Sequence, residues 1–139
     1  VGRVQHSAAQ QRLFDRFRSQ LASGTAPVGG FDVDGRPVSV GSPVAYLAIP
    51  SIGVKQVVVE GTRPSTLAKG PGHRRDTVLP GQFGTSVLFG RRAMFGGPFA
   101  DIAQLRKGEK IFVTTAQGEF TLSLIHISSA RQSVAVVGR

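Results

Sequence analysis

The chain has 139 residues, of which 40% are hydrophobic and 18% are charged, with 18 glycines, 8 prolines and no cysteine. This length suits one domain, the glycine content argues against an all-helical bundle, and the apolar content excludes a wholly disordered chain. The lack of cysteine excludes disulfides, thiolate zinc sites and a cysteine nucleophile, while the net charge of +9, carried mostly by arginine, implies an anionic partner or surface.

The first predicted element is an amphipathic helix from Gln5 to Ala22. Apolar residues recur there at every fourth position: Ala9, Leu13, Phe17 and Leu21. Ser23 and Gly24 end this pattern, because glycine is favoured just beyond a helix. The stretch from Gly24 to Pro43 is rich in Gly, Pro, Asp and Ser, and is typical of a loop or tether.

After the tether, the pattern changes to short runs of β-branched and apolar residues. Six runs predict strands: Val44–Ile49, Val54–Glu60, Thr85–Phe89, Lys110–Thr115, Glu119–Ser128 and Ser133–Val137. Short helices are expected at Pro64–Lys69 and Pro98–Leu105, since proline is favoured in the first turn of a helix. We therefore expect a mainly β fold, a small barrel or sandwich, with a helix and stalk over residues 1–43 and the barrel domain over residues 44–139.

Basic residues are densest between residues 63 and 92, on turn-rich segments. Two adjacent pairs, Arg74-Arg75 and Arg91-Arg92, favour an anion-binding groove over the alternative of a merely solvated surface. Nucleic acid is the obvious polyanion. It is not the favoured partner, because the nine Phe and one Tyr are not interleaved with the basic residues.

The three histidines, His6, His73 and His126, lack the spacing of metal ligands, and we expect no metal or cofactor. His73 ends the rigid turn Gly70–His73, and His126 alternates with apolar strand residues, so a structural role is favoured for both. The sequence has no Gly-x-Ser-x-Gly motif and no visible pair of acidic residues. Serine-hydrolase and glycosidase mechanisms therefore have no support.

Several motifs occur in one order along the chain. They are Leu47–Val54, Val58–Thr62, Gly70–His73, Thr77–Gln82, Val87–Arg92, Gly97–Phe99 and Lys107–Ile111. This order resembles the sortase family, and in particular its class E type from actinobacteria, over about residues 44–125. The resemblance implies an eight-stranded β-barrel with short connecting helices. It also implies a membrane-anchored transpeptidase of the Gram-positive cell surface, which cleaves a Leu-Pro-x-Thr-Gly-like signal and joins the new carboxyl end to an envelope amine.

On the same resemblance, residues 5–43 are a membrane-proximal stalk. A membrane segment is then expected upstream of Val1, and the domain is expected to be extracytoplasmic and associated with the cell envelope. A barrel without the family's last strands would expose a sheet edge, which we expect another chain or an unusual pairing to cover.

The chain departs from the family at the residues of the reaction. Active sortases need a Cys, a His and an Arg, and the His follows the glycine that ends the strand matched by Val87–Gly90. This chain has Arg91 at that position, and arginine stays protonated and cannot transfer a proton. The chain has no Cys, and no residue can be assigned to the family's Arg.

We therefore interpret the chain as a catalytically inactive sortase-like domain that binds or scaffolds a peptide or an anionic envelope component. The candidate ligand-binding residues are Arg91, Arg92, His73, Arg74 and Arg75. Two alternatives stay open. The chain is a fragment or variant of a class E sortase, a cysteine transpeptidase, or it is a small basic β-barrel that binds nucleic acid.

Overall fold

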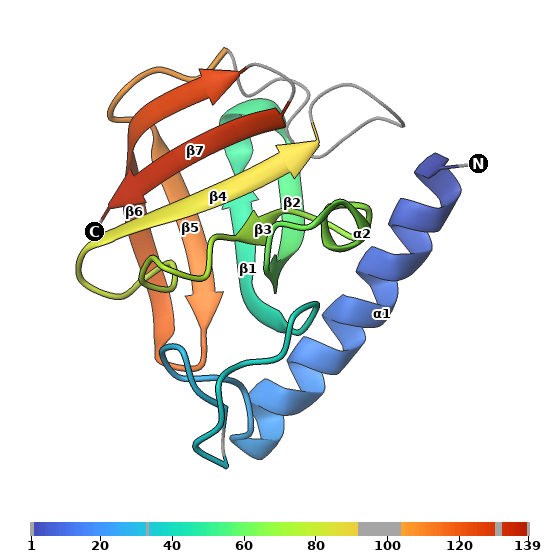
Figure 1. Ribbon diagram of the computed structural model, residues 1–139. Coiled ribbons are helices and arrows are strands. Elements are labelled where there is room, and N and C mark those ends of the chain that lie inside the picture. The colour runs from blue at the N-terminus through green and yellow to red at the C-terminus, as the bar shows by residue number, and fades with distance from the viewer. Residues whose placement is uncertain (1, 33, 92–103, 130–131, 139) are drawn as a thin grey trace.

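The described residues form one long helix, a closed β-barrel and short helical turns in the connections (Figure 1). The structure is a computed structural model that describes residues 2–32, 34–91, 104–129 and 132–138. Helix α1 covers Gly2–Ser23. The strands are β1 (Pro43–Ile49), β2 (Val54–Glu60), β3 (Gly72–His73), β4 (Thr85–Arg91), β5 (Lys110–Thr115), β6 (Gly118–Ser129) and β7 (Gln132–Gly138). A 3-10 turn (Pro50–Ile52) joins β1 to β2, and the short helix α2 (Pro64–Leu67) follows β2.

The mainly β fold expected from the sequence is confirmed. Within the described residues the barrel closes in the order β1-β2-β3-β4-β7-β6-β5, seven strands where the resemblance implied eight. All six predicted strands are present, with ends that differ by at most two residues, and the sequence patterns missed only β3. The predicted helix at Pro98–Leu105 falls outside the described residues, apart from Gln104 and Leu105.

Strand alternation builds the barrel core. The largest fully buried side chains of the main core include Leu47, Ile49, Leu88, Ile111 and Leu122, each 1% exposed. On β2, Val58 belongs to this core, whereas its neighbours Val57 and Val59 pack under α1 with Leu13. Because successive strand residues point to opposite faces, Glu60 points to the same side as Val58, toward the barrel interior.

Helix α1 lies against the outer face of β1 and β2. Ala9, Leu13 and Phe17 are buried at the predicted four-residue spacing, and the ring of Phe14 meets that of Tyr46 edge-on at a centroid distance of 5.4 Å. The predicted amphipathic helix is therefore confirmed. In the described residues, no helix has the length and apolar content to cross a bilayer.

The Gly/Pro-rich stretch after α1 contacts the barrel rather than standing apart from it. Val38 is 1% exposed and belongs to the main core. The backbone N–H of Gly41 donates to the Glu60 carbonyl over 2.8 Å, and the N–H of Glu60 donates to the Ser42 carbonyl over 2.9 Å. The domain boundary at residue 43 stays a prediction.

Strand β7 fills the position where we expected an open edge. It pairs antiparallel with β4, where Leu88 lies opposite Ala135, and antiparallel with β6, where Leu124 lies opposite Val137. These partners are buried core residues. In the described part of the chain, β7 therefore joins β4 to β6. The barrel closes at this position without a strand from a second chain.

Candidate functional site

The candidate residues that the structure describes lie at or just after the ends of β3 and β4. His73 ends β3 and is followed by Arg74 and Arg75, while Arg91 ends β4, where its backbone pairs with Gln132 of β7. Arg92 lies outside the described residues. The structure therefore describes the surroundings of His73, Arg74 and Arg75 in atomic detail.

His73 forms a buried pair with Glu60, a residue that the sequence analysis did not select. The Nδ1 atom of His73 lies 2.5 Å from Oε1 of Glu60, and the two side chains are 2% and 4% exposed. Strands β2 and β3 are parallel and set Glu60 beside His73, while the β3–β4 pairing sets His73 beside Leu88. Since paired residues share a face and Leu88 is a core residue, the pair points into the barrel.

The neighbours of the ring indicate how many protons the pair carries. His73 Nε2 lies 2.8 Å from the Val78 carbonyl oxygen, which only accepts hydrogen bonds, so Nε2 must carry a hydrogen. The short contact between Nδ1 and Glu60 then needs one further proton, held by the imidazole or by the carboxyl group. In either form the pair has no net charge, which explains how a carboxyl group and an imidazole are tolerated inside an apolar barrel.

Thr77 completes an arrangement with the connectivity of a catalytic triad. Its Oγ1 lies 3.1 Å from His73 Nε2, on the side of the ring opposite Glu60. A triad histidine must accept the hydroxyl proton on that nitrogen. Here the Thr77 hydroxyl instead donates to the Arg74 carbonyl over 2.8 Å, and Nε2 already carries a hydrogen. These hydrogen-bond directions leave Thr77 without a base at His73. The structural role that the sequence favours for His73 stays a prediction.

The two arginines after His73 point to different partners. Arg74 Nε lies 2.7 Å from Asp76 Oδ1, and both side chains are exposed, so this ion pair contributes little to stability. Arg75 donates from Nη2 to the Val38 carbonyl over 2.8 Å. A shared role of these arginines and His73 in ligand binding stays a prediction.

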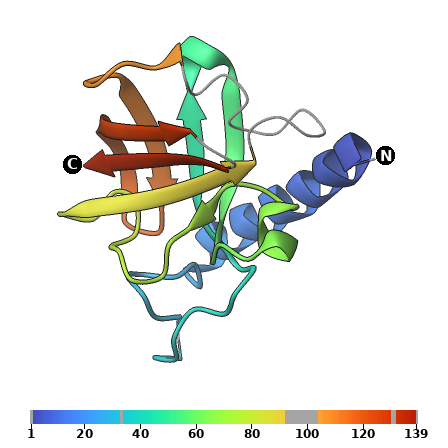
Figure 2. The ribbon, with the colours of Figure 1, turned by 45° about the horizontal axis from the view of Figure 1, so that its top comes forward.

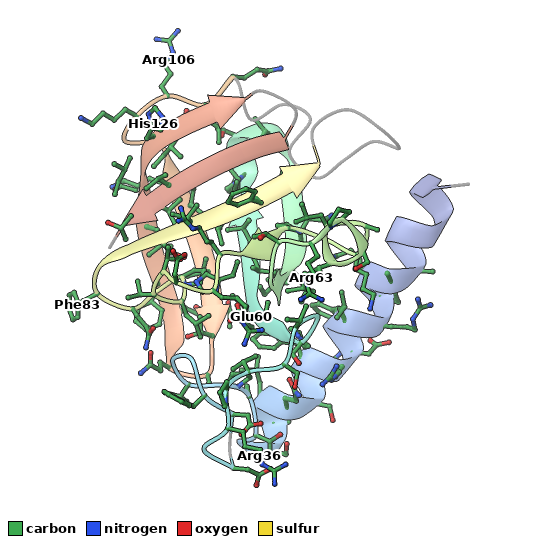
Figure 3. All side chains as sticks on the ribbon, viewed as in Figure 1. Arg36, Glu60, Arg63, Phe83, Arg106 and His126 are labelled. Carbon is green, nitrogen blue, oxygen red and sulfur yellow. The ribbon has the colours of Figure 1, made fainter. Side chains whose placement is uncertain are left out.

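A pocket of about 330 Å³ lies beside the Glu60–His73 pair. Figure 3 shows Glu60 toward the end of the barrel that faces the loops after α1. The lining comprises Gly30, Glu60, His73, Arg75, Asp76, Thr77, Val78, Leu79 and Gln82. The described residues contain no cluster of three His, Cys, Asp or Glu side chains able to hold a metal ion. The side chains that line the pocket can donate and accept hydrogen bonds, and Glu60 and His73 can share a proton.

One signal in the sequence could have revealed Glu60. The strand Val54–Glu60 ends on a carboxylate two residues after Val58, so strand alternation places both on one face. A carboxylate on a core face needs a partner, and the rigid turn ending at His73 supplies one.

Comparison with known proteins gives a consistent result. The family model described as Sortase domain matches residues 47–138. Sortase D of Bacillus subtilis (strain 168) is 34% identical over 85 residues, which cover 61% of this chain and 41% of that protein. The chain thus spans about two fifths of the length of this curated relative.

Solved structures agree on the fold. A Clostridium perfringens Sortase D5 transpeptidase superposes with a TM-score of 0.69 at 16% identity, covering 94% of this chain and 98% of that chain. C. perfringens sortase C, solved with the C-terminal cell wall sorting motif, gives 0.60 at 21% identity over 94% and 86% of the two chains. SrtF sortase from Corynebacterium diphtheriae is 33% identical, with a TM-score of 0.58 over 66% of this chain and 46% of that chain. At their low identity, the two Clostridium structures bear on the fold alone.

Proposed function

The chain belongs to the sortase family, and from this premise we propose that it is a sortase-fold domain that binds a peptide or an anionic envelope component without catalysing transpeptidation. The observation that carries the proposal is the absence of cysteine from all 139 residues. The resemblance assigns the nucleophile of the reaction to a cysteine. A hydroxyl substitute at Thr77 has no available base, because His73 Nε2 is already protonated.

Arg91 supports the same proposal. It directly follows Gly90 at the end of β4, where the resemblance places the histidine of the reaction. A guanidinium group cannot act as an acid or base near neutral pH, but it binds carboxylate and phosphate groups through paired N–H donors. The substitution therefore replaces a proton-transfer group with an anion-binding group.

Family membership also suggests where the domain works. Sortases are enzymes associated with the cell envelope, so we propose an extracytoplasmic location and attachment to the membrane through a segment upstream of Val1. The class E type within the family and the loss of activity belong to the same proposal.

Calorimetric titration with a sorting-signal peptide that carries a free carboxylate tests the binding role. We expect measurable binding to the unmodified chain. The double variant Arg91→Ser/Arg92→Ser should have a Kd about tenfold higher, since charge-assisted hydrogen bonds contribute on this scale. The matched control, Arg16→Ser/Arg18→Ser, removes two exposed arginines of α1 and should leave the Kd unchanged. Equal affinities of the three proteins, or no binding by the unmodified chain, would contradict the proposal.

A second candidate is that the chain is part of a catalytically complete class E sortase. The observation that favours it is the match to only 41% of the length of Sortase D. Sequencing the coding DNA on both sides of the 139 codons separates the two candidates. If the downstream codons encode a further strand that ends in cysteine, the second candidate is supported. If they encode no such strand, a domain without the reaction is supported.

A further inference from the structure

The pocket of about 330 Å³ lies where the segment after β3 meets the loop after α1. Figure 2 shows these two segments close together at one end of the barrel. Gly30 of the loop lines the pocket, and a Cβ built on this glycine would meet no atom within 4 Å. On the loop side the pocket is therefore bounded by bare backbone with free space beside it.

The buried wall of the pocket is Glu60, and one oxygen of its carboxyl group is available. Oε1 is taken by Nδ1 of His73. Within the described residues no hydrogen bond reaches the other oxygen, Oε2, and the fully buried side-chain atoms that lack a partner are Gln20 Oε1 and Ser86 Oγ. Oε2 is thus neither paired nor sealed off, although the Glu60 side chain is only 4% exposed. Because Glu60 lines the pocket, Oε2 is accessible from there.

Gln82 brings an available hydrogen-bond donor to the same pocket. Its Oε1 accepts the Leu79 N–H over 3.1 Å, which fixes the orientation of the amide group. In the described part of the chain no acceptor bonds the other end of the amide, Nε2. This atom lies beside Gly29, since a Cβ on that glycine would be 3.3 Å from it. The pocket thus offers one acceptor and one donor that have no partner.

The charges around the pocket favour a neutral ligand. The Glu60–His73 pair has no net charge, and the lining adds one exposed cation, Arg75, and one exposed anion, Asp76. A carboxylate bound inside would place its charge against Glu60 Oε2, and an ammonium group would leave Gln82 Nε2 without an acceptor. A neutral group that carries both an N–H and a carbonyl oxygen satisfies the two atoms together.

We propose that this pocket binds a small neutral molecule through a primary carboxamide group. The amide N–H donates to Glu60 Oε2, and the amide carbonyl accepts from Gln82 Nε2. The volume suits a small molecule, because it lies near the lower end of the roughly 300–1,000 Å³ of ligand pockets. Neither Arg91 nor the lack of cysteine enters this proposal, so its test is separate from the tests of the proposed function.

Titration of the unmodified protein with propionamide, followed through the NMR shifts of backbone amides, tests the site. Propionate is the matched ligand, because it has nearly the same shape but offers Glu60 Oε2 no donor. We expect saturating shifts at Val78, Leu79 and Gln82 with propionamide, and a Kd about tenfold higher for propionate. Shifts that do not saturate, shifts confined to other residues, or equal Kd values for the two ligands would overturn the proposal.

The variant Gln82→Glu tests the donor with a nearly isosteric change. One carboxylate oxygen still accepts the Leu79 N–H, whereas the other replaces the N–H donor by an acceptor. We expect the Kd for propionamide to rise about tenfold. Gln117→Glu introduces the same charge at an exposed residue outside the lining and should leave the Kd unchanged. Equal effects of the two substitutions, or none from either, would overturn the assigned site.

Discussion

Glu60 and His73 are polar side chains inside an apolar barrel, and each satisfies the other. Replacing Glu60 by Leu leaves His73 Nδ1 buried without a partner, so we expect a loss of about 1–3 kcal/mol in the free energy of unfolding. Glu60→Gln should cost much less, because the amide N–H can donate to an unprotonated Nδ1 while Nε2 still donates to the Val78 carbonyl. Urea denaturation measures these differences.

The double variant Glu60→Leu/His73→Leu is the control for this prediction. It removes both polar groups together and should be more stable than Glu60→Leu alone, since no buried imidazole is then left unpaired. Equal losses for Glu60→Leu and Glu60→Gln would show that the hydrogen bond to His73 is not what Glu60 contributes.

Of the three side chains that meet at this site, the sequence analysis named one. It singled out His73, whose ring is buried and bonded to Glu60 and Val78, while the role of this residue stays a prediction. Glu60 and Thr77 were missed as partners. Their contacts with His73 depend on the register of β2 against β3, a strand of two residues that no hydrophobic pattern can reveal.

The side chain of Gln10 on helix α1 hydrogen-bonds to the backbone of strand β2. Strand β3 pairs with β2 only at Val59 and Glu60, so Val57 has no strand partner on that side. Gln10 Oε1 accepts the Val57 N–H over 2.7 Å, and its Nε2 donates to the Val57 carbonyl over 3.1 Å and to the Lys69 carbonyl over 2.7 Å. The amide thus takes the place of a neighbouring strand.

Gln10→Ala should therefore lower the free energy of unfolding by about 1–3 kcal/mol, because it leaves part-buried backbone groups of Val57 unpaired. The Val57 amide should also exchange faster. Gln11→Ala is the matched control: Gln11 is exposed and bonds only Asp15 on its own helix, so its change should stay within about 0.5 kcal/mol. Equal effects of the two substitutions would contradict the role assigned to Gln10.

The elements themselves were largely predictable, and their contacts were not. Strong β-branched runs predicted six strands, and a four-residue apolar spacing predicted α1. The sequence predicted a loop or tether around Val38, because a single buried side chain in a Gly/Pro-rich stretch gives no periodic pattern. The place of β7 between β4 and β6 depends on long-range pairing, which local patterns do not carry.

Fold and reaction are separate properties of the whole molecule. A core of alternating apolar residues closes the barrel, and none of these residues takes part in acyl transfer. The barrel therefore does not need a cysteine in order to fold, and sortases and this chain share it. The same barrel can present arginines to a ligand at the position where the resemblance places a histidine.

A transpeptidation assay tests most directly whether this chain has the sortase fold without the sortase reaction. The protein is incubated with a sorting-signal peptide and an amine acceptor, and mass spectrometry follows both the peptide and the intact protein. We expect an uncleaved peptide, no amine-joined product above the buffer control and an unchanged protein mass, because the chain has no cysteine to form the acyl intermediate that the resemblance implies. Cleavage of the peptide, or an acyl adduct on the protein, would contradict a sortase fold without the sortase reaction.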